Sequence, residues 1–202
     1  MLVSSDARLL VSENAVIPNV AEYLNKLRKH RHEVFCHSLN TAYLVAEILF
    51  RNYSDNLSLI IKKKDWNNVV QGALLHDIGK LKIDNDILLK KSSLSDKEIE
   101  EIHKHTIYGY DIVKSDKKLS SMTKEIVLSH HERCDGTGYP NKVMDIPDYV
   151  KVVGMCDKYD ALTENRSYRP KKDLFTAFKI LMEEKSEIDF DMFLLLASIS
   201  EK

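Results

Sequence analysis

The sequence predicts an all-α fold, a single helical-bundle domain with a short N-terminal lead-in. Apolar residues recur at steps of three and four along most of the chain, which is the period of an amphipathic helix. No convincing alternation of apolar and polar residues, as a strand would show, follows residue 20. The 202 residues include only 6 Gly and 4 Pro, which argues against a sandwich or barrel with many turns.

The first half of the chain is expected to contain four helices after the lead-in. The expected segments are a strand-like or irregular lead-in over residues 1–18, then helices over 19–29, 31–51, 57–61 and 65–77. Asn19 is the expected cap of the first of these helices. In the long helix, Glu33 and His37 are four residues apart and therefore lie one turn from each other on one face.

The second half is expected to be helical on either side of one long irregular stretch. The expected segments are helices over 95–105, 105–114, 122–132 and 149–162, an irregular stretch over 134–147, and two final helices that begin near 173 and 189. Ser95 and Glu98 have the spacing of a capping box. Asp173 and Asp189 are the expected caps of the last two helices.

Composition and charge argue against several classes of protein. Hydrophobic residues make up 44% and charged residues 30%, as in an ordinary globular domain. The 30 Lys and Arg nearly balance the 31 Asp and Glu, so net charge does not indicate a nucleic acid polymer or a membrane as partner. No apolar run approaches the roughly 20 residues of a membrane span, and the start does not resemble a signal peptide. Three cysteines without a C-x-x-C pair favour the reducing cytoplasm.

One short stretch suggests chemistry. An apolar run that ends at Leu75 is followed at once by His76, Asp77, Gly79 and Lys80. A neutral imidazole beside an ionised carboxylate suits a transition-metal ion. The glycine lets the chain leave the helix without a Cβ clash, and the lysine places a fixed positive charge nearby that suits a phosphate.

Further histidines and carboxylates extend this pair into a candidate metal centre. The full set of candidate ligands, drawn from five helices or helix ends, is Glu33, His37, His76, Asp77, His105, His130, His131 and Asp157. Burying so many polar groups without a counter-charge would be prohibitive. Eight ligands exceed the needs of one cation and imply two or three divalent metals. The absence of sulfur ligands and the presence of bridging carboxylates favour iron or manganese over structural zinc.

The order H…HD…H…HH…D resembles that of HD-domain phosphohydrolases. The segment His130-His131-Glu132-Arg133-Cys134-Asp135-Gly136-Thr137-Gly138-Tyr139-Pro140 is similar to the HD-GYP subfamily, as are the DKYDALT run at 157–163 and the RSYRP run at 166–170. The resemblance covers about residues 33–172. Two departures stand out: Ser167 replaces the usual proline, and the loop over 141–145 is short and lacks the usual glycine.

The resemblance implies a catalytic domain over residues 19–202 that hydrolyses the bacterial second messenger cyclic di-GMP to linear pGpG and then GMP. It implies that the eight candidate ligands hold two or three divalent metals, iron first and manganese second, with Glu33 at the position of members with a third metal. It implies catalytic roles for Asp77 and Lys80. Lys80, Arg166 and Arg169 would contact the substrate, and Asp160 would position Lys80 or the substrate, or only cap locally.

The resemblance also implies a surface lip at Gly138-Tyr139-Pro140 that contacts a signalling protein, and it leaves a homodimer open. Two alternative functions remain. The domain could bind cyclic di-GMP and turn it over poorly, or it could hydrolyse another nucleotide. His30, His32 and His103 are expected to be solvated rather than to bind metal.

Overall fold

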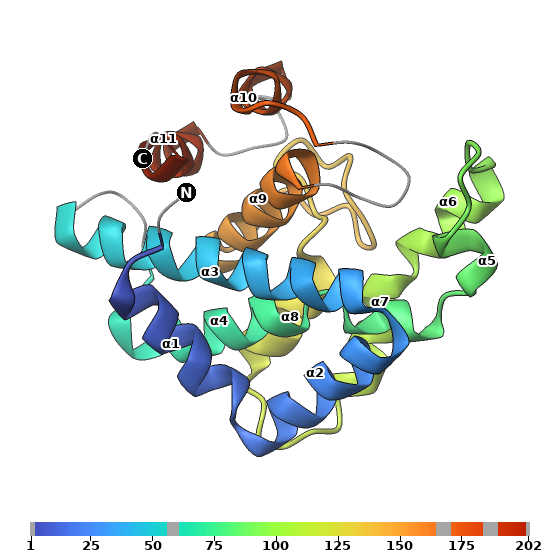
Figure 1. Cartoon of the computed structure of the whole chain (residues 1–202), viewed down its shortest axis with the longest axis horizontal. Helices are drawn as coiled ribbons and strands as arrows, with labels where there is room; N and C mark the ends of the chain where they lie inside the picture. Colours follow the sequence, from blue (N-terminus) through green and yellow to red (C-terminus); the bar gives the residue numbers. More distant parts are fainter. Residues whose placement is uncertain (1–2, 56–60, 165–170, 184–189, 201–202) are drawn as a thin grey trace.

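In the computed structural model, every regular element among the described residues is helical (Figure 1), which confirms the predicted all-α fold. The structure describes residues 3–55, 61–164, 171–183 and 190–200. The helices are α1 (Ser5–Ala15), α2 (Pro18–His30), α3 (His32–Asp55), the 3₁₀ turn η1 (Lys63–Asp65), α4 (Trp66–Leu75), the 3₁₀ turn η2 (Ile78–Lys82), α5 (Asn85–Leu88), α6 (Asp96–His103), α7 (His105–Val113), α8 (Ser121–Ser129), α9 (Asp148–Thr163), α10 (Leu174–Glu183) and α11 (Phe190–Ser200).

Helix α3 runs through the middle of the bundle and packs against α1, α2, α4, α9 and α11. In Figure 1, α1 and α2 lie below it, while α9, α10 and α11 lie above it. Helix α4 packs between α3 and α8, and every residue from Val69 to Leu75 is buried. Because this part of α4 is buried, the residues that follow its C-terminal end lie in the core of the bundle.

The expected irregular or strand-like conformation of the lead-in is wrong, because residues 5–15 form α1. Ser4 caps this helix by accepting a hydrogen bond from the Ala7 amide, and Ala7 and Val11 are buried in the common core. Asn14, which is also buried, donates to Asn67 Oδ1 at 2.9 Å. The boundary at residue 18 between lead-in and catalytic domain stays a prediction.

The expected cap at Asn19 is also wrong. Helix α2 begins one residue earlier with Pro18, whose fixed φ suits the first helical position. Asn19 Nδ2 instead donates to Asp116 Oδ2 at 3.0 Å and ties α2 to the turn after α7.

The remaining helices lie close to the predicted ranges. The capping box of Ser95 and Glu98 is present at the start of α6. Asp173 accepts a hydrogen bond from the Thr176 amide at 2.9 Å and so caps α10. Helix α8 ends at Ser129, three residues before the predicted end, so His130 and His131 follow the helix. The predicted helix at 57–61 lies almost wholly outside the described residues, as does the predicted cap Asp189.

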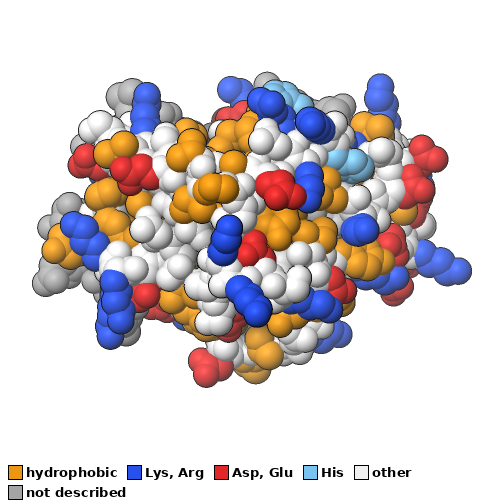
Figure 2. Space-filling model, turned by 90° about the horizontal axis from the view of Figure 1, so that it is seen from below, with side chains coloured by type: hydrophobic (Ala, Val, Ile, Leu, Met, Phe, Trp, Pro, Cys, Tyr) orange, Lys and Arg blue, Asp and Glu red, His pale blue; other side chains and the backbone are white. Residues whose placement is uncertain are grey.

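The surface carries charges of both signs. On the face shown in Figure 2, Lys and Arg side chains alternate with acidic and apolar ones, as the formal net charge of −1 leads one to expect. None of the described helices has both the length and the hydropathy needed to cross a membrane.

Candidate metal centre

His76 is placed by the end of α4. Its side chain is fully buried, and Nδ1 donates to the carbonyl oxygen of Ala73 at 2.7 Å. Because that carbonyl can only accept, the proton is on Nδ1 and the lone pair is on Nε2. Nε2 is buried without a hydrogen-bond partner among the described residues.

His105 and His130 are oriented in the same way. The Nδ1 atom of His105 donates to the Ile102 carbonyl at 2.6 Å, and that of His130 donates to the Ile126 carbonyl at 3.1 Å. The two Nε2 atoms, both left with lone pairs, lie 3.2 Å apart. Two nitrogens bound at about 2.1 Å to one ion, at right or tetrahedral angles, are about 3.0–3.4 Å apart. The spacing therefore fits a shared cation.

Close backbone packing holds these histidines in place. A Cβ on Gly79, in η2, would lie 1.8 Å from the His105 carbonyl oxygen. A Cβ on Gly154, in α9, would lie 2.4 Å from the His130 carbonyl oxygen. Only glycine permits these close contacts. Gly79 was predicted to let the chain leave the helix, and it also lets η2 pack directly against the backbone of α7.

Asp77 lies at the centre of the cluster. Its carboxylate oxygens are 3.4 Å from Nε2 of His76 and 3.4 Å from Nε2 of His105. Oδ2 accepts a hydrogen bond from Lys80 Nζ at 2.6 Å, while Oδ1 is buried without a hydrogen-bond partner among the described residues. Burial raises the pKa of Asp77, but Lys80 and His76 outweigh burial and hold the pKa well below its usual range. Asp77 is therefore ionised, and it would hold a divalent metal ion if one were bound.

His37, on α3, lies between two carboxylates of α9. Its Nε2 contacts Asp157 Oδ1 at 2.8 Å and its Nδ1 contacts Asp160 Oδ2 at 2.5 Å. Burial disfavours a charge on the ring, but the bonds to Asp157 and Asp160 outweigh burial and raise its pKa to about 9. A cation at Nε2 would replace that proton, and Asp160 would hold the other nitrogen, as carboxylates often do behind metal-bound histidines.

His131 lies at the rim of the cluster. Its Nδ1 is 3.8 Å from Asp157 Oδ2, and the side chain is partly exposed. Burial lowers the pKa of His131 to about 3 and that of His105 to about 4. It also lowers the pKa of His130 well below the usual value. These three rings are neutral near neutral pH, which is the form that binds metal.

All of the predicted metal ligands except Glu33 fall into three overlapping groups. The groups are His37, His76 and Asp157; His76, Asp77 and His130; and His105, His130 and His131. Within each group, the ligand atoms lie within 4.8 Å of one another. Shared members join the groups into one centre. This donor set, with the bare atoms His76 Nε2 and Asp77 Oδ1, fits divalent metal ions.

The other predicted site residues lie elsewhere. Glu33 is outside these groups, and its Oε2 is 3.6 Å from Arg31 Nη2. Asp160 lies behind His37, an arrangement that favours a positioning role over substrate contact. Arg166 and Arg169, together with Ser167, lie outside the described residues.

The Gly138-Tyr139-Pro140 segment folds back over the histidine pair. The ring of Tyr139 stacks on His131 and on His103, with centroids 4.7 Å and 3.9 Å away. The Tyr139 amide donates to the His131 carbonyl at 3.1 Å. His103, which is expected from the sequence to be solvated, instead packs on the ring of Tyr139 and is partly buried. The stack orients His131 and leaves Tyr139 only partly exposed.

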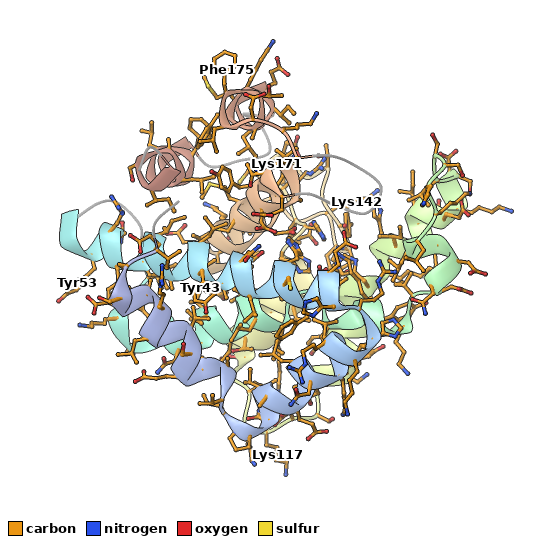
Figure 3. All side chains as sticks on the ribbon, viewed as in Figure 1. Tyr43, Tyr53, Lys117, Lys142, Lys171 and Phe175 are labelled. Atoms are coloured by element: carbon orange, nitrogen blue, oxygen red, sulfur yellow. The ribbon has the colours of Figure 1, made fainter. Side chains whose placement is uncertain are left out.

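The loop after this segment is fixed by Glu132. This buried carboxylate accepts hydrogen bonds from the amides of Asn141 at 2.6 Å and Val143 at 3.1 Å. Lys142, labelled in Figure 3, has a φ of 57°, the left-handed region that favours glycine. The short loop without its usual glycine therefore keeps a glycine-like conformation.

A cavity of about 370 Å³ opens beside the cluster. Its lining includes Lys80, His105, His131, Tyr139 and Asp157. A ligand in this cavity could therefore reach both the histidine cluster and the Lys80 ammonium group.

The sequence model of the HD domain family matches residues 1–194. The chain belongs to the HD domain family. A protein of Thermotoga maritima named cyclic di-GMP phosphodiesterase is 41% identical over 110 residues, which is 53% of this chain and 30% of that protein. A protein of Vibrio cholerae named 3'3'-cGAMP-specific phosphodiesterase 2 is 41% identical over 112 residues, which is 54% of this chain and 22% of that protein. The match thus spans less than a third of either relative.

The solved structure of Bd1817, an HDG"Y"P protein from Bdellovibrio bacteriovorus, has the same fold. It superimposes with a TM-score of 0.68 at 18% sequence identity, over 97% of this chain and 62% of that one. The family match and the shared fold confirm the predicted HD-type helical domain, and an HD domain implies divalent metal binding.

Proposed function

We propose that this HD domain is a metal-dependent phosphodiesterase that hydrolyses cyclic di-GMP to linear pGpG, with GMP as a further product. The observation that carries the proposal is the set of three overlapping ligand groups around Asp77, built from imidazoles and carboxylates. The name of the Thermotoga relative supports the choice of substrate.

Two or three divalent ions, iron first and manganese second, would be held by the seven clustered ligands, with Asp77 as the bridge. When bound, such ions act as Lewis acids that activate water and stabilise the oxygens of a phosphoryl displacement. The carboxylates and the absence of thiolate in the groups favour iron or manganese over zinc. Glu33 stays a predicted ligand for a third ion.

The protein's own groups would bind and orient the phosphodiester. Lys80 lines the cavity and presents an ammonium group that can donate to a phosphate oxygen as negative charge builds. Its bond to Asp77 fixes this charge beside the bridging carboxylate. Asp160 would hold His37 in the orientation that turns Nε2 toward the centre. Arg166 and Arg169 are proposed to contact the remaining phosphate and guanine groups, as the resemblance implies.

A second candidate substrate is 3'3'-cyclic GMP-AMP, because the Vibrio cholerae relative named for it is as similar to this chain as the Thermotoga protein. Both substrates carry the same type of phosphodiester, so the same centre would serve either. The two differ in one purine base, which the residues beyond the metal centre must distinguish.

The test is turnover by anaerobically prepared protein with added iron or manganese, followed by chromatography. Formation of pGpG from cyclic di-GMP supports the proposal, and faster cleavage of 3'3'-cyclic GMP-AMP would favour the second substrate. Tight binding of cyclic di-GMP without product would point to the binding module instead. If the protein cleaves neither cyclic di-GMP nor 3'3'-cyclic GMP-AMP, its substrate is another nucleotide.

A protein contact at the Gly138-Tyr139-Pro140 lip, a homodimer and a cytoplasmic location stay predictions. The ring of Tyr139 is stacked between His131 and His103 and is only partly exposed. The exposed apolar side chains of the same loop are Val143 and Met144, with 42% and 64% of their surface exposed. We infer that a partner at this loop would contact these two residues rather than Tyr139.

A further inference from the structure

A second cavity, of about 420 Å³, lies on the other side of Lys80 from the first. Lys80 and Ile102 line both cavities and therefore separate them. The walls of the second cavity come from the start of α3 with the residue before it, from α5, and from the linker between α5 and α6. None of the three ligand groups contributes a residue to it.

The lining of this cavity combines an apolar wall with a buried cation. Val34, Ile87, Leu88 and Leu94 supply the apolar surface. The side chain of Arg31 is only 12% exposed, and its Nη2 lies 3.6 Å from Oε2 of Glu33, which also lines the cavity. A charged guanidinium forms stronger hydrogen bonds to a ligand's acceptor atoms than a neutral donor does.

This chemistry matches a purine base. The flat faces of the base would pack on the aliphatic side chains, and the guanidinium of Arg31 would donate to the base edge. Arginine commonly forms a bidentate contact with O6 and N7 of guanine, whereas adenine carries a donor in place of O6. The cavity therefore suits guanine better than adenine.

We propose that the second cavity receives one guanosine of a cyclic dinucleotide while the phosphodiester to be cleaved lies at Lys80. This inference rests on the proposed function and adds where part of the substrate is bound. Each cavity alone lies near the lower end of the usual 300–1,000 Å³ for small-molecule sites. A ligand with two nucleosides joined through phosphates would occupy both, with Lys80 between them.

The test compares two substrates of one holoenzyme. Bis(p-nitrophenyl) phosphate is small and reports the metal centre alone, whereas cyclic di-GMP needs both cavities. Leu94→Trp places a larger side chain in the wall of the second cavity, and Leu94 belongs to none of the ligand groups. We expect kcat/KM for cyclic di-GMP to fall at least 10-fold while hydrolysis of bis(p-nitrophenyl) phosphate and metal content stay at wild-type levels. The matched control is Leu9→Trp on α1, where the side chain is 58% exposed and neither substrate should be affected.

Arg31→Met provides a second, independent variant. It keeps the aliphatic length and removes the donor, so KM for cyclic di-GMP should rise about 10-fold with little change in kcat, the scale of one lost bidentate contact. If Leu94→Trp does not fold, it will also lose hydrolysis of bis(p-nitrophenyl) phosphate. The KM of Arg31→Met for cyclic di-GMP then still tests the proposal.

The outcomes separate the two claims. If wild type cleaves cyclic di-GMP and both variants match it, the second cavity is not a substrate site, and the proposed function stands. If wild type cleaves only bis(p-nitrophenyl) phosphate, or neither compound, the proposed function falls and this inference with it.

Discussion

Replacing Asp160 by Asn should weaken metal binding by about 5- to 30-fold, because Asp160 holds a histidine of the candidate metal centre in place. Asp160 contacts Nδ1 of His37 at 2.5 Å, and the buried His37 ring has a pKa of about 9 instead of 6.5. That rise corresponds to about 3 kcal/mol of preference for a positive ring, at about 1.4 kcal/mol for each pH unit. Asp157 and Asp160 each supply one of its two hydrogen bonds, so the share of Asp160 is about 1–2 kcal/mol. The proton on Nε2 occupies the place of a metal ion, so the same loss should apply to the metal.

The assay is a competition titration of Mn²⁺ against a chelator, with wild type and Asp160→Asn prepared in parallel. Asp111→Asn is the matched control, because Asp111 lies on the surface with its side chain 52% exposed. Unchanged metal affinity together with a raised KM would refute the reasoning, because Asp160 would then contact substrate, as the family resemblance allows.

Four further predictions follow from other parts of the molecule. Lys80→Ala should keep the metal and lower kcat about 10²- to 10³-fold, the scale of one lost electrostatic stabiliser; loss of metal with unchanged kcat would make Lys80 structural. Glu33→Gln should remove a third ion and keep two, as elemental analysis would show; equal stoichiometry would make the centre binuclear. Gly79→Ala should lower the free energy of unfolding by about 3 kcal/mol or more, measured in urea, because its Cβ meets backbone; a loss below about 1 kcal/mol would contradict this. Glu47→Gln should lower the free energy of unfolding by about 1–2 kcal/mol near neutral pH, and urea titrations below pH 4.5 should show no difference between variant and wild type. A difference that does not change with pH would disprove the role given to the ionised Glu47 carboxylate.

The surroundings of Glu47 favour the ionised form of its carboxylate. Burial opposes its ionisation, but hydrogen bonds from the Ser4 amide at 2.9 Å and Arg51 Nε at 3.1 Å outweigh burial and lower its pKa. A lowered pKa in the folded state means that the stabilisation is present above the unfolded value of 4.5 and is lost as the pH falls through the folded value.

The burial of several candidate ligands could be predicted from the sequence because their positions follow local rules. His76 comes directly after an apolar helix, and His37 lies on a helix whose stripe faces the core, so both are buried. What the sequence could not show is how these side chains are oriented. The pairing of His37 with Asp160 spans 123 residues, and the stack of His103 on Tyr139 depends on a loop that folds back.

Helix α1 was missed for a related reason. Its buried face includes Asn14, a polar residue that breaks the apolar period and becomes acceptable only through bonds to Asn67 and Gln71 on α4. Ser4, which caps the helix, was the available signal. The early end of α8 likewise depends on His130, whose ring bonds back to the last turn of the helix.

The most direct test of the metal centre is the metal content of the protein purified without oxygen, wild type beside His130→Ala. His130 belongs to two of the three ligand groups, so its loss should disturb more than one ion. We predict at least two equivalents of iron or manganese per wild-type chain, a clear loss in the variant, and cleavage of cyclic di-GMP by the wild type alone. Equal metal content and equal turnover in the two proteins would contradict the assignment of this cluster as the active centre.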